Sequence, residues 1–356
     1  MKKVTIRDLY DFYNNELTSS VKNKNALRVF EMNKMEFLRI ALDRINNPDY
    51  MIKRYNIFLI YEPKPRIIMS LNLIDKLINH YFTTTVLIPK IEPLLDNRNI
   101  ATRKNLGTSY GIKLIRKYIE YYKKHHNGKF YVLKIDISKY FYNIDHEVLK
   151  KMIKKELEED EYKRVCNIVD STNFPYINKE IEKVRRFDPT LPIYQPGKGL
   201  GIGNLSSQTL SVYYLSRLDH YIIHTLKLKH YVRYMDDFLM LSDDKEKLEK
   251  AFIIIKDKLK NEYKLNINPK KSFVSRGDIG FTFLGYKFFI SKKNNKTIMI
   301  LKQDSYIRIK RNIKKVNSLY NNGKITYTRY FATISNYMYS YKGSVMKIRN
   351  YINRNF

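Results

Sequence analysis

Two adjacent aspartates, Asp236 and Asp237, are the residues of this sequence best placed to do chemistry. Short apolar and aromatic runs at 231–235 and 238–241 flank them, which predicts a β-hairpin that turns at the acids. Two carboxylates on one tight turn repel each other, so we expect a cation beside them, and a divalent metal ion suits them best. An ordinary polar surface turn would explain an isolated pair, so the metal site needs further support from the rest of the chain.

A third acid, Asp136, provides that support. It lies near the end of the run 130–137, which has the composition of a buried strand. An aspartate in such a strand is costly unless it is paired or bound to metal. If this strand and the hairpin share one sheet, three carboxylates converge. That is the requirement for two-metal phosphoryl transfer, in which ions about 4 Å apart activate the attacking hydroxyl and stabilise the leaving pyrophosphate.

A glycine-rich segment, residues 195–208, lies between these acids in the sequence. Glycines allow the backbone to approach a ligand closely, and the segment leads into an apolar helix that Ser206 or Ser207 could cap. A flexible loop would account for the glycines alone. It would not account for the ordered Gly-Asn-Leu-Ser-Ser-Gln run before the helix.

Two basic segments precede the first catalytic strand. Strands at 55–61 and 66–69 predict a hairpin with prolines at its bend, where Lys64 and Arg66 could grip phosphates. Ordinary surface cations explain this segment equally well. The loop 97–108 is also basic and leads into a predicted helix at 110–122, so it forms a weak candidate anion site.

The composition indicates a partner that is a polyanion. The 356 residues include 67 Lys and Arg against 35 Asp and Glu, for a formal charge of +32, and 31 Tyr and 18 Phe could stack on bases. A general bias toward Lys, Asn, Ile and Tyr contributes but does not by itself give so unequal a charge. The single cysteine, Cys166, excludes an internal disulfide framework. Without a signal peptide or an apolar run of membrane-spanning length, we expect a cytoplasmic protein, bacterial or phage-encoded, with no membrane partner.

The ordered set of motifs resembles the reverse transcriptase family from about Tyr55 to Ile290. Five segments carry the resemblance. In chain order they are the first catalytic motif Asp136-Ile137-Ser138-Lys139-Tyr140-Phe141, the glycine-rich segment, the Tyr-x-Asp-Asp box Tyr234-Met235-Asp236-Asp237, the lysine motif Lys270-Lys271-Ser272, and the primer-grip hairpin Phe283-Leu284-Gly285-Tyr286. A Tyr-x-Asp-Asp box alone would be weak evidence, but the whole set in this order is highly specific.

The resemblance implies an α+β fold of right-hand polymerase architecture, with fingers, a palm built of an antiparallel sheet plus helices, and a helical thumb. The expected parts are an N-terminal helical extension (1–54), fingers (55–129), palm (130–290, with part of the fingers at 160–200), and the end of the primer grip with the thumb (291–356). The residue pattern also predicts a strand at Leu265–Ile267 and a hairpin of Phe281–Ile290 with Thr297–Leu301. Basic helices are expected from Ile307 onward, where they would follow a duplex backbone.

The resemblance also implies roles for individual residues. Asp136, Asp236 and Asp237 would be catalytic and hold two Mg²⁺ ions, which Mn²⁺ could replace, with the Ile137 carbonyl as a further ligand. The expected nucleotide-binding residues are Arg66, Arg103, Phe141, Ile202, Gly203, Gln208 and Lys271. The expected template and primer contacts are Lys64, Tyr234, Leu284, Gly285 and Tyr286. Phe141 matches the steric gate that excludes a 2′-hydroxyl, although a core phenylalanine is the alternative, and Lys271, or else Lys270, matches the proton donor to pyrophosphate.

Within the family, the Ile-Gly-x-x-x-Ser-Gln form of residues 202–208 resembles reverse transcriptases of diversity-generating retroelements. Those enzymes copy a template RNA into cDNA with errors at template adenines. Ile202 in place of an amide would remove a hydrogen bond near the nascent pair and weaken selection against mispairs. The resemblance implies as partners the template RNA, the cDNA primer strand, the RNA–DNA duplex, dNTPs and a small basic accessory protein.

Two other functions stay open. One is an antiphage-defence or retron-type reverse transcriptase, although the Val-Thr-Gly signature of retron thumbs is absent from the sequence. The other is a catalytically inactive basic RNA-binding protein. The intact Asp136, Asp236 and Asp237 argue against it, because no structural need explains three converging acids in a chain this basic.

Overall fold

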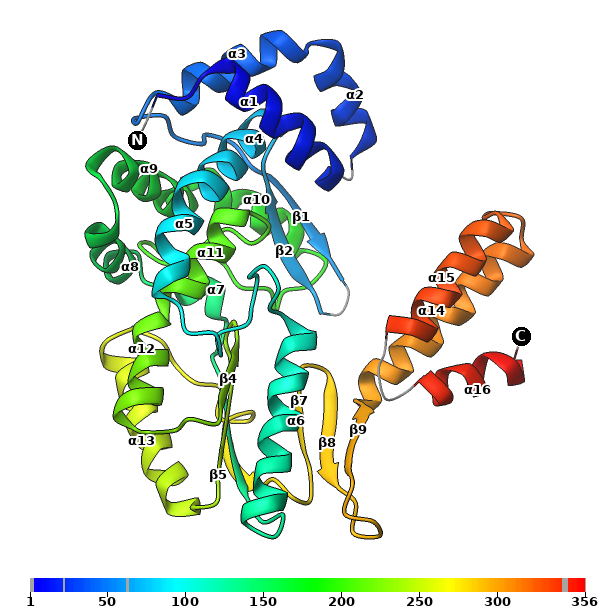
Figure 1. Ribbon diagram of the computed structural model, residues 1–356. Coiled ribbons are helices and arrows are strands. Elements are labelled where there is room, and N and C mark those ends of the chain that lie inside the picture. The colour runs from blue at the N-terminus through cyan, green and yellow to red at the C-terminus, as the bar shows by residue number, and fades with distance from the viewer. Residues whose placement is uncertain (1–2, 22, 62–63, 341–344, 356) are drawn as a thin grey trace.

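The computed structural model describes residues 3–21, 23–61, 64–340 and 345–355 (Figure 1). Helices and antiparallel sheets alternate along it, so the expected α+β class is confirmed. The α-helices are α1 (Ile6–Phe12), α2 (Lys24–Met32), α3 (Lys34–Ile45), α4 (Leu73–Phe82), α5 (Ile88–Ile91), α6 (Thr108–His125), α7 (Tyr140–Asn143), α8 (His146–Ile153), α9 (Glu159–Asp170), α10 (Pro175–Arg185), α11 (Leu205–Tyr214), α12 (Ser216–His220), α13 (Lys245–Asn261), α14 (Gln303–Asn321), α15 (Tyr327–Ser340) and α16 (Val345–Asn355). The strands are β1 (Asn56–Ile60), β2 (Arg66–Ser70), β3 (Tyr131–Asp136), β4 (Tyr231–Tyr234), β5 (Asp237–Ser242), β6 (Phe273–Arg276), β7 (Phe281–Phe283), β8 (Tyr286–Ile290) and β9 (Thr297–Leu301).

The central element is a four-stranded sheet of order β4-β5-β3-β6, called the palm sheet below. All of its pairs are antiparallel. Side chains alternate between two faces, as a strand period of two requires. Leu133 and Phe238 lie in the core on the α11–α13 side, whereas Val132 and Leu239 lie in the core shared with α6 and β7–β9. Both faces are therefore covered, and Figure 1 shows α6 and α13 on opposite sides of β4 and β5.

The outer edge of β4 is also covered. The Arg233 amide donates to the Arg98 carbonyl at 2.8 Å, and the Ile100 amide donates to the Arg233 carbonyl at 3.0 Å. Asn99 forms a bridge with Arg233 in a parallel direction. The segment before α6 thus fixes the strand that leads to the acidic pair.

The N-terminal helices form a layer over α4 (Figure 1). Their shared core contains Leu9, Phe30, Leu38 and Ile78. Thr5 is the N-cap of α1 and forms a capping box with Asp8, which fixes where the first helix begins. This layer supports α4, and α4 in turn contacts α11 behind the palm sheet.

Two predicted strand assignments were wrong. Leu265–Ile267 is irregular apart from a bridge between Ile267 and Ile137, because the chain turns there after α13 with Lys264 at a positive φ of 55°. The strand in that part of the palm sheet is β6 instead. Phe281–Ile290 is two strands, β7 and β8, since positive φ at Leu284 and Gly285 makes a tight turn, and the sheet is three-stranded, β7-β8-β9.

The C-terminal helices follow β9 directly. Figure 1 shows α14 and α15 side by side, to one side of the palm sheet. Ile309, Ile313 and Ile334 join the core that also contains β7–β9. Of the bend between β1 and β2, Lys64 and Pro65 are described, whereas Glu62 and Pro63 lie outside the described residues. Among the described helices, none combines the length and apolar composition needed to cross a bilayer.

Candidate active site

The palm sheet brings the three acids together. β3 and β5 pair so that Asp136 lies directly opposite Asp237, and β4 and β5 pair so that Tyr234 lies opposite Asp237. Met235 and Asp236 make the two-residue turn between these strands. The Ile137 amide donates to the Asp236 carbonyl at 3.2 Å, which holds the turn against the end of β3. Residues a hundred positions apart in the sequence therefore share one end of the sheet.

The turn itself is held by a buried ion pair that sequence reasoning missed. Arg233 is fully buried, and its Nε and Nη2 donate to the two oxygens of Asp219 at 2.7 and 2.6 Å. Its Nη1 donates to the Met235 carbonyl at 2.8 Å. Met235 has a φ of 55°, in the left-handed region, without being glycine. Arg233 thus stabilises the strained residue that precedes Asp236.

The charge of Arg233 is maintained by its partner. Burial opposes the charged form, but the Asp219 carboxylate more than offsets this and raises the pKa of Arg233 above its ordinary value. Tyr231 also donates its hydroxyl to Asp219 at 2.5 Å. The signal in the sequence was an arginine inside an apolar strand pattern, because a buried arginine requires an acid elsewhere.

The acids have an unfavourable environment without a bound cation. Burial first, and the neighbouring Asp236 and Asp136 carboxylates second, raise the pKa of Asp237 to about 7, against the opposing effect of Lys134. Burial also raises the pKa of Asp236, with a further contribution from Asp136. Lys271 Nζ lies 3.0 Å from each Asp136 oxygen and Lys134 Nζ lies 3.4 Å from Asp237 Oδ1. Two lysines thus supply the positive charge at this site.

The donor set fits a divalent metal ion. Asp237 Oδ1 is buried, and its 3.4 Å contact with Lys134 Nζ is too long for a good hydrogen bond, so this acceptor keeps capacity to bind a metal ion. Carboxylate oxygens are the ligands that Mg²⁺ prefers. In the described chain, no group of three or more acid, histidine or cysteine side chains is already arranged around one ion position, and the Lys271 ammonium contacts Asp136 instead. Binding a metal there requires this ammonium to give up its contact.

Lys134 connects the acids to the second sheet. Besides its contact with Asp237, its Nζ donates to the Thr282 carbonyl of β7 at 3.2 Å and lies 5.8 Å from the centre of the Phe283 ring. Its side chain is only 17% exposed. Asp237 and the β7–β8 hairpin are therefore linked by one cation, which the sequence pattern did not single out.

Three of the predicted nucleotide-binding residues, Arg66, Ile202 and Gly203, lie on two neighbouring segments. Arg66 begins β2 and is exposed, and the Met69 amide of the same strand donates to the Ile202 carbonyl at 2.8 Å. Gly203 has a φ of 119°, and a Cβ there would lie 2.9 Å from a side-chain carbon of Ile68. Any larger residue would collide with β2. The glycine-rich segment and β2 therefore lie side by side.

The other four predicted nucleotide-binding residues contact other parts of the protein in this structure. Phe141 is half-buried on α7 and packs against the core, and Gln208 is half-buried on α11. Lys271 contacts Asp136, as described above. Arg103 uses its guanidinium inside its own loop, where Nε donates to Glu92 at 2.7 Å and Nη1 to the Asp96 carbonyl at 2.7 Å. A contact between Arg103 and a triphosphate would need these bonds to open.

The predicted caps of α11 were wrong. Asn204, and not Ser206 or Ser207, occupies the N-cap position of α11. Ser206 is buried, and its hydroxyl accepts a hydrogen bond from the Asn79 side chain at 2.7 Å. The serine binds α4 to α11 because its position inside the first turn directs it into the core.

The predicted template and primer residues lie on two hairpins. Lys64 is exposed beside β2, and Tyr234 is half-buried at the end of β4. Leu284 and Gly285 form the β7–β8 turn, and the buried Tyr286 pairs with Phe283 across it. The Lys302 amide donates to the Gly285 carbonyl at 2.9 Å, which joins this turn to the start of α14.

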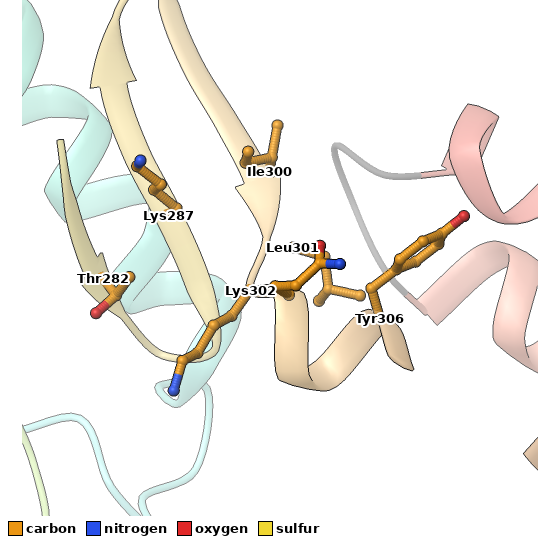
Figure 2. A pocket seen from close by; sticks show the side chains of 7 residues that line it. Thr282, Lys287, Ile300, Leu301, Lys302 and Tyr306 are labelled. Atoms are coloured by element: carbon orange, nitrogen blue, oxygen red, sulfur yellow. The ribbon is translucent and has the colours of Figure 1, made fainter. Parts of the chain in front are cut away.

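A groove of about 260 Å³ opens beside this turn. Figure 2 shows Lys287 on β8 and Tyr306 on α14 at its two sides, with Lys302 between them. Two lysines and an aromatic ring suit contact with a nucleic-acid strand. This groove lies next to the predicted primer contacts at the β7–β8 turn and continues to the start of α14.

A family model described as reverse transcriptase (RNA-dependent DNA polymerase) matches residues 62–288, which is more than half of the chain. The chain belongs to the reverse transcriptase family. The matched region contains the three acids and every other predicted site residue. Reverse transcriptases are RNA-directed DNA polymerases that generally use divalent metal ions, and the right-hand fold is that of the family.

Solved telomerase structures also match this reverse transcriptase. Apo telomerase from Candida tropicalis truncated from its C-terminal domain has 16% identity and a TM-score of 0.46, over 69% of this chain and 55% of that one. Apo telomerase from the same organism has 14% identity and a TM-score of 0.48, over 74% and 52%. Telomerase from Candida albicans with a fragment of telomeric RNA has 16% identity and a TM-score of 0.45, over 70% and 47%. The chain spans about half the length of these structures, and no curated protein matches it.

Proposed function

We propose that this reverse transcriptase is an active enzyme that copies a template RNA into cDNA by two-metal nucleotidyl transfer. The observation that carries the proposal is the strand register, which sets Asp136 opposite Asp237 with Asp236 on the adjoining turn. The environment of Asp237 supports it, because burial and the neighbouring Asp236 and Asp136 carboxylates raise its pKa even though Lys134 lies 3.4 Å away, so further positive charge would stabilise the ionised acids.

Asp136, Asp236 and Asp237 would hold two Mg²⁺ ions, or Mn²⁺ in their place, with the Ile137 carbonyl as a further ligand. The ions would supply charge stabilisation for the attacking 3′-hydroxyl and the leaving pyrophosphate. The chain's own lysines have separate tasks. Lys271 donates a proton to the departing pyrophosphate, and Lys134 keeps Asp237 in place through its bond to the Thr282 carbonyl.

The incoming nucleotide would be positioned by the paired segments around β2. Arg66 binds the triphosphate, with Arg103 as a second candidate, and Phe141 excludes a 2′-hydroxyl. Ile202, Gly203 and Gln208 border the nascent base pair, since the backbone contact between Met69 and Ile202 places this segment against the fingers hairpin. Lys64, Tyr234, Leu284, Gly285 and Tyr286 would contact template and primer.

Primer extension tests the proposal. The purified protein is expected to extend a DNA primer on an RNA template with dNTPs and Mg²⁺, and Asp236→Asn is expected to abolish extension. Asp243→Asn is the matched control, because this exposed acid follows β5 at the far end from the turn. No incorporation by the wild type under Mg²⁺ or Mn²⁺ would instead support an RNA-binding protein without catalysis.

We further propose that the enzyme belongs to a diversity-generating retroelement and makes errors at template adenines, together with a small basic accessory protein that presents the template RNA. The support is Ile202, which is half-buried beside β2 and offers no side-chain hydrogen bond to a base pair. Each kilocalorie per mole by which the free-energy difference between correct and incorrect pairing decreases raises misincorporation about fivefold.

Adenine-resolved sequencing of the cDNA tests this second step. Ile202→Gln is expected to lower misincorporation opposite adenine more than opposite the other bases, whereas Ile202→Val should keep the wild-type error pattern. Uniformly accurate copying by the wild type would favour a defence or retron-type role instead.

A further inference from the structure

A second groove lies outside the active site. It has a volume of about 460 Å³ and lies between α6, the loop before α6 and the residues that lead into β4. The residues that matter most for its chemistry are Arg98, Tyr110, Lys117, Tyr121, Lys229 and His230. His230 precedes β4, so this part of the groove lies at the opposite end of that strand from the catalytic turn. We call it the α6 groove.

The α6 groove contains a preformed aromatic surface. The His230 ring lies between Tyr118 and Tyr121, with centroid distances of 4.7 Å to each. Tyr122 fixes the imidazole through a hydrogen bond of 2.7 Å between its hydroxyl and His230 Nδ1. Tyr118 and Tyr122 also donate to the Tyr231 and Leu241 carbonyls, at 3.3 and 3.0 Å. The rings are tilted or edge-on to one another, at 37° between Tyr118 and His230 and 61° between Tyr121 and His230, and the cluster is anchored to β4 and β5, yet Tyr121 remains 43% exposed.

The spacing on α6 directs this surface outward along one face. Tyr110, Leu114, Lys117 and Tyr121 are separated by four, three and four positions, so they lie along one side of the helix. An exposed aromatic ring on a rigid support loses little conformational freedom when it stacks on a ligand. This face of α6 is therefore suited to binding a ligand and does not serve only to pack against the core.

The charge of the α6 groove is positive. Asp96 is the acid among its lining residues, and its carboxylate is paired with Arg98 at 3.1 Å. Lys117 and Lys229 are exposed and form no ion pair with a described residue. After the Asp96 pair is cancelled, two ammonium groups remain beside the aromatic surface. This combination complements a ligand with phosphates and flat bases.

We infer that the α6 groove binds single-stranded RNA at a site separate from the polymerase site. Stacking on Tyr121 requires an unpaired base, which excludes a continuous duplex. The exposed ring would add little to the binding of an acidic peptide, whereas each base that stacks on it strengthens the binding of RNA. The choice of RNA over other polyanions rests on the proposed function, because a reverse transcriptase holds template RNA that it has not yet copied.

Binding of a labelled oligouridine of about 12 nucleotides tests the inference, by fluorescence anisotropy in EDTA at physiological salt. The double variant Lys117→Glu/Lys229→Glu is expected to weaken binding by about tenfold or more relative to a matched double variant, Lys113→Glu/Lys124→Glu. Lys113 and Lys124 are exposed on the same helix but do not line the groove, and both variants change the net charge equally. Tyr121→Ala is expected to weaken binding by roughly fivefold or more.

Photocrosslinking adds a positional readout. RNA containing 4-thiouridine should crosslink to the peptides that carry Tyr121 or His230, and the crosslink should disappear in Lys117→Glu/Lys229→Glu. Equal losses of affinity in the two double variants, without a crosslink in the α6 groove, would overturn the inference. Binding of an acidic peptide that depends on the groove, with RNA binding unchanged, would also overturn it and identify a protein-docking surface.

Failure of the α6 groove as an RNA-binding site can be distinguished from failure of the proposed polymerase function. Primer extension on a template whose single-stranded 5′ overhang is only a few nucleotides long, too short to reach the α6 groove, reports the polymerase site alone, and Lys117→Glu/Lys229→Glu is expected to leave its rate within about twofold of wild type. On a template with a long single-stranded extension, the same variant should need more RNA for half-maximal rate. An inactive wild type with groove-dependent RNA binding would reject the polymerase and keep the binding site.

Discussion

Two hairpins of this protein solve the same geometric problem in different ways. The β4–β5 and β7–β8 connections are both two-residue turns, and both begin with a non-glycine residue at positive φ, 55° at Met235 and 50° at Leu284. In the β7–β8 turn the second residue is Gly285 at a φ of 82°. In the β4–β5 turn it is Asp236, which the proposed chemistry requires.

The difference lies in what stabilises each turn. Leu284 contributes an apolar contact, since its side chain lies so close to Gly111 of α6 that a Cβ there would be 2.8 Å away. The β4–β5 turn instead relies on a hydrogen bond from the buried Arg233, which Asp219 fixes. A positive φ costs a non-glycine residue about 1–2 kcal/mol. Where chemistry dictates the turn sequence, the surrounding fold must supply that energy.

The largest expected effect comes from breaking the buried pair. Asp219→Asn leaves Arg233 buried without a counter-charge, so it is expected to lower the free energy of unfolding by about 3–5 kcal/mol and to abolish primer extension. Urea unfolding followed by circular dichroism measures the first effect. The exposed pair Lys245–Glu249 is the control, and Glu249→Gln should cost less than about 1 kcal/mol. Similar costs at both sites would show that the catalytic turn does not depend on Arg233.

A smaller effect is expected at the other turn. Gly285→Ala places a Cβ at a φ of 82°, which should lower the free energy of unfolding by about 1–2 kcal/mol. Nothing lies within 4 Å of that Cβ, so the cost comes from the backbone and not from a collision. Gly285→Asn should cost less, because asparagine tolerates positive φ. Equal stability of both variants with wild type would mean that the turn relaxes freely.

The third expected effect concerns pH in the absence of metal. Burial raises the pKa of Asp237 from 3.8 to about 7, so the folded protein keeps a proton that the unfolded chain releases above about pH 4. In EDTA the free energy of unfolding should therefore fall as the pH rises from about 4 to 7, and level off above that range.

Asp237→Asn removes this dependence. The variant should be more stable than wild type at pH 8, by up to about 4 kcal/mol, and close to wild type near pH 4. Thermal melts in EDTA at both pH values measure the difference. Added Mg²⁺ should stabilise the wild type more than the variant. A wild type whose melting temperature does not change over this pH range in EDTA would contradict the buried carboxylate pair as the source of the effect.

The sequence alone predicted the local features of the site. Asp136 stood out because an acid at the end of an apolar strand is unusual, and Asp236 and Asp237 because two acids on one turn need a cation. The strand register that joins them follows from burial, since β3 and β5 direct alternate residues to the same two cores.

The sequence could not predict features that depend on distant partners. Arg233 pairs with Asp219, which lies on helix α12, and Lys134 bonds to Thr282, which lies in another sheet 148 positions away. Neither pairing leaves a periodic pattern in the sequence. The mistaken strand at Leu265–Ile267 has a related cause. Leu265 is buried and Ile267 faces the core, so the alternation was real, but it belongs to a loop after α13 that covers the sheet.

The covered edge of β4 has a consequence for the behaviour of the protein in solution. A bare edge strand invites backbone pairing with another molecule. Here the amide and carbonyl of Arg233 are already engaged by Arg98 and Ile100, so a strand from another molecule cannot pair with this residue. The segment before α6 thus protects the β4 edge at the residue that leads to the acidic turn.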